Sequence, residues 1–367
     1  MTMTLDGSLG TTFNDGSLQG AAASPYGLKN KIINGDMVID QRNAGASVTP
    51  TGGYTLDRWG LSVSQNSKFT VQQNQNSVTP PTGFTSYLGL TTATAVTVGA
   101  SDYFALYQPI EGYNIADLDF GKATAKTVTL SFWVRSSLTG TFGGVLANSG
   151  FTRSYPFSYT ISVANTWEQK SVTITGDTSG TWLTTNGIGM YVWFALGVGS
   201  TYSGAAGAWG TTAYYSVTGA TSVVGTLGAT FYITGVQLEQ NTAATPFERR
   251  LYDKELISCQ RYYYLHATGA AKNIATAAYY TATNASGYVQ FPVQMRATPS
   301  TSNTTGTNYY VFYRNGASDT FNSLIIDGPT QNSTQLYNNT EVSGTAGQAG
   351  YFYTNNASSV IAFTSEL

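Results

Sequence analysis

Apolar and polar residues alternate one by one in several short segments of this chain. The clearest segment is Thr127–Ser136, in which Val128, Leu130, Phe132 and Val134 occupy every second position. A period of two predicts a β-strand with one buried face. Similar strands are predicted at Lys68–Gln72, Ser171–Thr175, Gly189–Leu196 and Thr230–Val236.

Turn-forming residues separate these predicted strands. Clusters of Gly, Asn, Ser, Thr and Pro occur at 49–53, 79–83 and 176–180, and a Gly- and Ala-rich run at 197–212 predicts a long loop. Many short strands without helical periods between them favour an antiparallel β-sandwich or jelly roll over a parallel α/β fold. We therefore assign residues 29–245 to one jelly-roll-like β-sandwich.

One segment has the pattern of a helix. Thr245 is a candidate N-cap, Pro246 suits the first turn, and Glu248 has capping-box spacing. The next residues place an apolar stripe at i, i+4, i+7 and i+11, formed by Tyr252, Leu256, Cys259 and Tyr263. We predict a helical connector over residues 246–269, with this stripe as the oligomer interface of a homotrimer.

The two ends of the chain differ from each other. Residues 270–367 again predict short strands, at Gly287–Val293, Tyr309–Arg314, Ser323–Ile326, Gly350–Tyr353 and Val360–Thr364. About 95 residues suffice for a second, smaller β-sandwich.

Residues 1–28 contain few large apolar side chains, which predicts either an extended N-terminal arm without a core or a poorly ordered terminus. The predicted fold class is thus all-β, with one short helical connector.

Composition excludes several functional classes. Charged residues make up 10% of the 367, and the net charge is −2, which argues against nucleic acid as a partner. One Cys and one His cannot form an internal disulfide or a His/Cys zinc site. No apolar stretch approaches the length of a membrane helix, and the first residues lack the regions of a signal peptide. We expect no membrane insertion, no cofactor and no metal.

Candidate catalytic groups are sparse. Cys259 would need a histidine base to act as a nucleophile, but it lies on the apolar stripe, and His266 lies beyond the predicted helix end. Glycoside hydrolysis requires two carboxylates across a sugar, and no pair stands out among Asp36, Asp40, Asp102, Glu111, Asp117 and Asp119. We therefore predict no catalytic residues and expect that the protein is not an enzyme.

Aromatic residues are the strongest candidates for binding. A tyrosine ring stacks on the C–H face of a sugar while its hydroxyl forms a hydrogen bond. The same residues also serve protein recognition and cross-strand packing, so both remain alternatives. The candidate carbohydrate-binding residues near the long loop are Tyr202, Trp209, Tyr214 and Tyr215, and those in the C-terminal part are Tyr309, Tyr313, Tyr351 and Tyr353.

Several motifs resemble a family of tail-fibre and receptor-binding proteins of tailed bacteriophages. The motif NKIINGDMVIDQRNAGASVT followed by YTLDRWG resembles the start of its β domain, and GVQLE, TPFE and CQRYY within Gly235–Tyr264 resemble its end. The segments Phe291–Ser300 and Ala349–Leu367 resemble the C-terminal module that often follows. The similarity runs from Asn30 to Leu367, but Leu61–Thr230 matches only in composition and strand pattern.

The resemblance implies a trimeric virion appendage with a carbohydrate-binding, jelly-roll-like sandwich. Residues 1–28 would bind another virion protein, and the exposed loops would bind a host surface glycan without catalysis, as in a tail fibre. The matched motifs form the framework, so no binding residue transfers from the family. One alternative is a structural virion component, such as a baseplate connector or a head fibre, with only protein partners. Another is a depolymerase that cleaves capsule or lipopolysaccharide.

Overall fold

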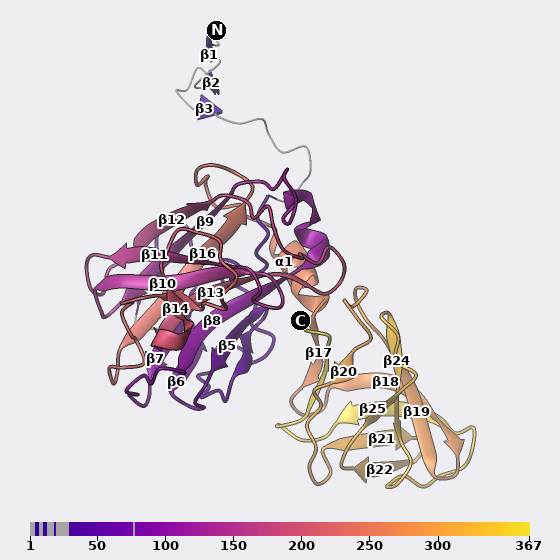
Figure 1. Cartoon of the computed structure of the whole chain (residues 1–367). Helices are drawn as coiled ribbons and strands as arrows, with labels where there is room; N and C mark the ends of the chain where they lie inside the picture. The colour runs from indigo at the N-terminus through magenta and orange to yellow at the C-terminus, as the bar shows by residue number, and fades with distance from the viewer. Residues whose placement is uncertain (1–3, 7–9, 13–17, 20–28, 76–77) are drawn as a thin grey trace.

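The first domain consists of two antiparallel sheets packed face to face (Figure 1). The computed structural model describes residues 4–6, 10–12, 18–19, 29–75 and 78–367. One sheet has six strands in the order β11 (Ser154–Ile161), β10 (Gly140–Ala147), β13 (Ile188–Val198), β8 (Tyr103–Glu111), β5 (Trp59–Val63) and β4 (Gly53–Leu56). The other has five, in the order β12 (Glu168–Ile174), β9 (Val128–Ser136), β16 (Thr230–Glu239), β7 (Leu88–Thr92) and β6 (Phe69–Gln73).

The core of this sandwich lies between the two sheets. Val128, Leu130, Phe132 and Val134 of β9 are fully buried, as their alternation predicts. The ring of Phe132 packs against Phe194 of β13, with centroids 4.9 Å apart. All five strands predicted in this domain are confirmed, with shifted ends.

Shorter elements connect these strands. Two 3₁₀ turns, η1 (Gly112–Asn114) and η2 (Ala116–Leu118), follow β8. The predicted long loop, 197–212, holds a third, η3 (Ser200–Tyr202), and β14 (Ser203–Gly204), which pairs in parallel with β15 (Ser216–Val217) just beyond the loop.

The second domain is a smaller sandwich. Its large sheet has seven strands in the order β22 (Ala317–Phe321), β21 (Tyr310–Arg314), β25 (Ala349–Thr354), β18 (Asn273–Thr281), β19 (Asn284–Gln290), β24 (Ser333–Asn338) and β23 (Ile325–Asp327). Its small sheet has the order β17 (Tyr263–Thr268), β26 (Val360–Thr364) and β20 (Ser300–Thr301). Phe312 and Phe352 of the large sheet share a core with Phe363 of the small one. The all-β fold class is confirmed.

The connector is shorter than predicted, and the predicted capping box is wrong. Helix α1 covers only Tyr252–Gln260 and has no side-chain cap. The Thr245 amide and hydroxyl donate to Glu239, and the Glu248 carboxylate accepts from the Lys29 and Asn30 amides. These side chains therefore fix the end of β16 and the start of the sandwich instead of capping a helix.

The predicted oligomer stripe faces mainly inward. Cys259 is fully buried, and Tyr263 is 5% exposed and lies in β17, so neither can contact another subunit. The stripe spacing was correct for a helix, but its apolar face covers the first sandwich. Tyr252, at 64% exposure, and Leu256 remain at the surface.

The N-terminal arm is described only in part. Strands β1 (Thr4–Asp6), β2 (Gly10–Thr12) and β3 (Leu18–Gln19) pair in order as an antiparallel sheet. The other residues of 1–28 lie outside the described part, so the virion-anchoring arm stays a prediction.

The last residues of the chain join the two domains. The C terminus lies beside α1 (Figure 1), and the Glu366 carboxylate accepts from Arg58 and, at 2.8 Å, from Arg42. Arg58 is 1% exposed and also stacks on Tyr262, 3.6 Å from the ring centroid. A buried guanidinium needs such a partner because its desolvation is costly.

Replacing Glu366 with Gln should strongly destabilise the protein, because it leaves the Arg58 charge buried without a counterion. We expect a loss of about 3 kcal/mol in unfolding free energy, measured by urea denaturation. The matched control is Asp253→Asn, which removes a 63% exposed carboxylate beside Lys254 and should cost less than about 0.5 kcal/mol. Equal effects of the two substitutions would contradict this account of the junction.

The junction should also make stability depend on pH. Burial raises the pKa of Asp57 from 3.8 to about 7, although Arg42 and two hydrogen bonds from Gln41 oppose the shift. A carboxyl whose pKa is higher in the folded state than in the unfolded state stabilises the fold at pH values below its unfolded-state pKa. This stabilisation is lost as the pH rises through the folded-state pKa. The thermal midpoint should therefore decrease as the pH rises from about 4 to about 7. Asp57→Asn should flatten this slope, and an unchanged slope would contradict the assignment.

Candidate functional site

Four of the exposed tyrosines in the described part of the chain, and the partly buried Tyr353, lie on one side of the seven-stranded sheet. Along β18, β19, β21 and β25, alternate side chains enter the core and the others point outward. The outward tyrosines, called the tyrosine face from here on, are Tyr280, Tyr288, Tyr313, Tyr351 and Tyr353.

The register of the strands brings three of these rings together, those of Tyr313, Tyr351 and Tyr353. Tyr313 of β21 lies opposite Tyr351 of β25, which in turn lies opposite Thr276 of β18. The ring of Tyr353 contacts Tyr313 edge to face, with centroids 5.7 Å apart, and also approaches Tyr351. Cross-strand pairs of this kind hold the rings in fixed positions.

These rings remain open to solvent. The exposed fractions are 78% for Tyr280, 73% for Tyr288, 52% for Tyr351 and 46% for Tyr313. Tyrosines that pack in the core of the same sheet have much lower exposed fractions, such as 1% for Tyr279. The tyrosine face therefore presents aromatic surface that the fold itself does not use.

The face is also free of charge along its central strands. Between the rings, the described outward positions of β25, β18, β19 and β24 carry Ala, Ser, Thr, Asn, Gln and Tyr, including Thr276, Ser286, Gln335 and Tyr337. Hydroxyl and amide groups can both donate and accept hydrogen bonds. A flat surface of rings and such groups can hold a chain of neutral, hydroxyl-rich units, because rings stack on C–H faces.

Three of the four C-terminal candidates from the sequence belong to this face. Tyr313, Tyr351 and Tyr353 are brought together, whereas Tyr309 is partly buried against the second core. Tyr280 and Tyr288 were not among the candidates. Alternation along Asn273–Thr281 could have identified Tyr280, but Ala and Thr fill most of its positions and make the apolar pattern weak.

The four candidates near the long loop do not form one open surface. Tyr202 and Tyr215 stack on each other with ring centroids 4.6 Å apart, and Tyr215 covers Trp193 on the outer side of the six-stranded sheet. Trp209 instead packs against Trp182, and its indole donates to the Thr175 carbonyl. The Tyr214 ring lies against Gly204. These half-buried rings attach the loop to the sheet.

Four of the candidate catalytic groups have structural contacts. Burial raises the pKa of Cys259, which keeps its thiol protonated, and burial lowers the pKa of His266, whose ring nitrogen lies 2.7 Å from the Ile274 carbonyl oxygen. Glu111 pairs with Arg261, and Asp102 accepts from Ser64.

No group of three His, Cys, Asp or Glu residues in the described part of the chain could hold a metal ion. None of the helices in that part is long and apolar enough to cross a membrane.

Comparisons with known proteins give distant structural similarities. No family model and no curated protein matches the chain. A putative sugar binding protein from Bacteroides thetaiotaomicron aligns with a TM-score of 0.34 and 13% identity over 58% of this chain and 100% of its own. The enzymatically active domain of bacteriophage CBA120 tailspike protein 4 aligns at 0.32 and 13%, over 58% of this chain and 21% of its own. A family 11 carbohydrate-binding module from Clostridium thermocellum aligns at 0.28 and 10%, over 54% and 96%.

Substitutions should separate the tyrosine face from the core beneath it. Tyr288→Ala should change the unfolding free energy by less than about 1 kcal/mol, because its ring is exposed. Tyr279→Ala in the neighbouring strand should cost about 3 to 5 kcal/mol, because it empties a packed site. If urea denaturation gave equal losses, the face would be part of the core and not available for binding.

Proposed function

We propose that this protein attaches a virion to its host by binding surface carbohydrate, without catalysis, through the tyrosine face. The observation that carries the proposal is the set of solvent-exposed rings on a sheet surface whose central strands β25, β18, β19 and β24 carry no charge. Proteins rarely expose contiguous apolar surface without a partner for it. Here, hydroxyl groups border the rings, so a sugar polymer is a better ligand for the face than an apolar protein surface.

The absence of catalysis is supported by the chemistry of the face. Cleavage of a glycosidic bond needs an acid and a second carboxylate close to the sugar. The outward positions of the described strands β25, β18, β19 and β24 contain no carboxylate, and the neighbouring strand β23 adds a single one, Asp327, opposite Gln335. A bound glycan would therefore be held there and not cut.

The virion location rests on the motifs between Asn30 and Leu367 that resemble phage tail-fibre proteins. Residues 1–28 would bind another virion protein. The protein would be a homotrimer, with Tyr252 and Leu256 at the subunit contact and the buried Cys259 and Tyr263 excluded from it. A fibre with several copies of a weak glycan site gains avidity from simultaneous binding.

Binding to a printed array of bacterial surface polysaccharides tests the proposal. The full chain should bind at least one polysaccharide and release no oligosaccharide from it. The double substitution Tyr288→Ala and Tyr351→Ala should weaken binding roughly tenfold or more, since each stacked ring contributes about 0.5 to 1.5 kcal/mol.

Leu227→Ala is the control, because it removes a 68% exposed apolar side chain that belongs to neither the tyrosine face nor the proposed subunit contact, and it should leave glycan binding unchanged. Capture of virion proteins without any glycan binding would favour the structural alternative. Release of oligosaccharide would favour a depolymerase.

A further inference from the structure

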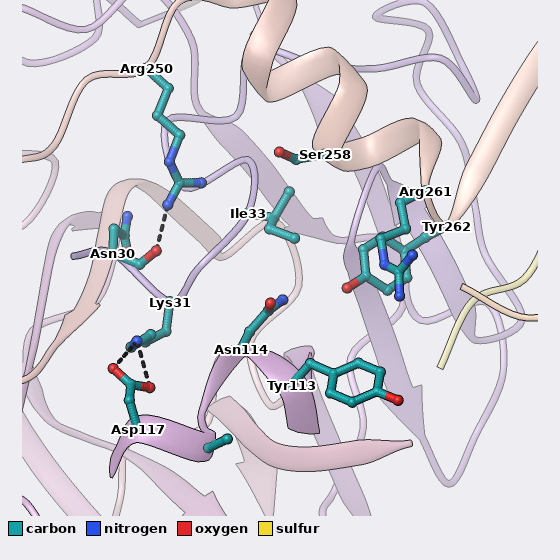
Figure 2. Close-up of a pocket in the computed structure, with 11 residues that line it drawn as sticks. Asn30, Lys31, Ile33, Tyr113, Asn114, Asp117, Arg250, Ser258, Arg261 and Tyr262 are labelled. Carbon is teal, nitrogen blue, oxygen red and sulfur yellow. Dashed lines mark hydrogen bonds and ion pairs between the residues drawn. The ribbon is translucent and has the colours of Figure 1, made fainter. Parts of the chain in front are cut away.

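A pocket of about 480 Å³ lies where α1 meets the first sandwich (Figure 2). Three segments line it: Asn30–Ile33, the 3₁₀ turns with Tyr113 and Asp117, and the connector with Arg250 and Ser258–Tyr262. Its volume falls in the range of small-molecule sites, about 300 to 1,000 Å³. The pocket shares no residue with the tyrosine face, so it is a separate site.

Every cationic group on its wall already has an anionic partner. The Lys31 ammonium donates to both oxygens of Asp117, at 2.8 and 2.7 Å (Figure 2). Arg261 donates to both oxygens of Glu111, at 2.9 and 2.6 Å. Arg250 pairs with Glu248 and Glu255, each at 3.3 Å. The wall therefore offers no free positive charge to an anionic ligand.

The Lys31–Asp117 pair has the chemistry to recognise neighbouring hydroxyl groups. Asp117 is 52% exposed on its side chain, and a carboxylate has about four lone-pair sites, so it can accept a further hydrogen bond. The ammonium beside it has three N–H groups, of which two point to Asp117. One hydroxyl of a diol can donate to the carboxylate while the next accepts from the ammonium.

Tyr113 and Asn114 complete the pocket. The Tyr113 ring lines the wall of the pocket and is 60% exposed. The side-chain amide of Asn114 also lines the pocket and forms no hydrogen bond with any described residue. The turn is held rigidly, because the amides of Gly112 and Tyr113 donate to the Gly187 and Thr185 carbonyls. A Cβ on Gly112 would lie 2.4 Å from the Leu183 carbonyl oxygen, so only glycine fits this close approach.

We infer that this pocket binds a neutral sugar unit through its vicinal hydroxyl groups. The Tyr113 ring stacks on the sugar, Asp117 and Lys31 bind two adjacent hydroxyls, and Asn114 binds a third. The balanced ion pairs favour a neutral sugar over an acidic one, because an acid would have to displace a bidentate carboxylate. The protein thus has a second sugar site, a pocket, in addition to the extended surface of the tyrosine face.

Saturation-transfer NMR on the full chain tests this inference with glucose, galactose, mannose, N-acetylglucosamine and glucuronic acid as separate probes. At least one neutral sugar should receive saturation, and Tyr113→Ala should reduce that signal at least fivefold. Asp117→Asn should do the same, since it weakens the hydroxyl contact without removing the ring. The Tyr113 ring is exposed, so Tyr113→Ala should keep the wild-type thermal midpoint. Asp117→Asn removes the partner of the Lys31 ammonium, whose side chain is 12% exposed, and should lower the midpoint slightly.

Two further variants distinguish this site from the tyrosine face. The Tyr288→Ala and Tyr351→Ala double variant and the Leu227→Ala control should both retain the monosaccharide signal. If the double variant loses the signal and Tyr113→Ala keeps it, the pocket inference is overturned while the proposed function stands. A signal from no neutral sugar, or a stronger signal from glucuronic acid, would also overturn it, whatever the polysaccharide array shows.

Discussion

The arrangement of the whole molecule depends on one buried charge, the guanidinium of Arg58. It lies in the first domain, and its carboxylate partner Glu366 is almost the last residue of the second. Because Arg58 is nearly inaccessible to water, its charge in the first sandwich is compensated only when the end of the chain is in place. The stack of Arg58 on Tyr262 adds the connector to the same contact. This coupling sets where the second sandwich sits and therefore where its large sheet is exposed.

Given that position, the alternation of side chains in the sheet creates the tyrosine face, the proposed binding surface. Residues such as Phe312 and Phe352 fill the core, and their neighbours Tyr313 and Tyr351 must point to solvent. The fold thus presents tyrosines on a rigid surface without adding a loop. By contrast, the aromatic residues of the long loop are used to attach it to the first domain, as the Tyr202–Tyr215 stack shows.

The sequence predicts the strands well where apolar residues alternate, as at Val128–Ser136, because burial of one face dictates that pattern. It predicts the connector poorly, because Thr245 and Glu248 have the spacing of a capping box but bond to distant residues. Long-range contacts of this kind leave no local pattern. Tyr288 was missed for a similar reason: a tyrosine in a strand can face either side, and only the register decides which.

The central claim is that the tyrosine face binds host glycan, and hydroxyl-radical labelling tests it directly because the reagent modifies exposed tyrosines. The full chain is labelled alone and in complex with a purified host surface polysaccharide, and the modified residues are identified by mass spectrometry. The account predicts protection of Tyr280, Tyr288, Tyr313 and Tyr351, with Tyr252 labelled equally in both samples. Unchanged labelling of these four tyrosines in the presence of bound polysaccharide would contradict it.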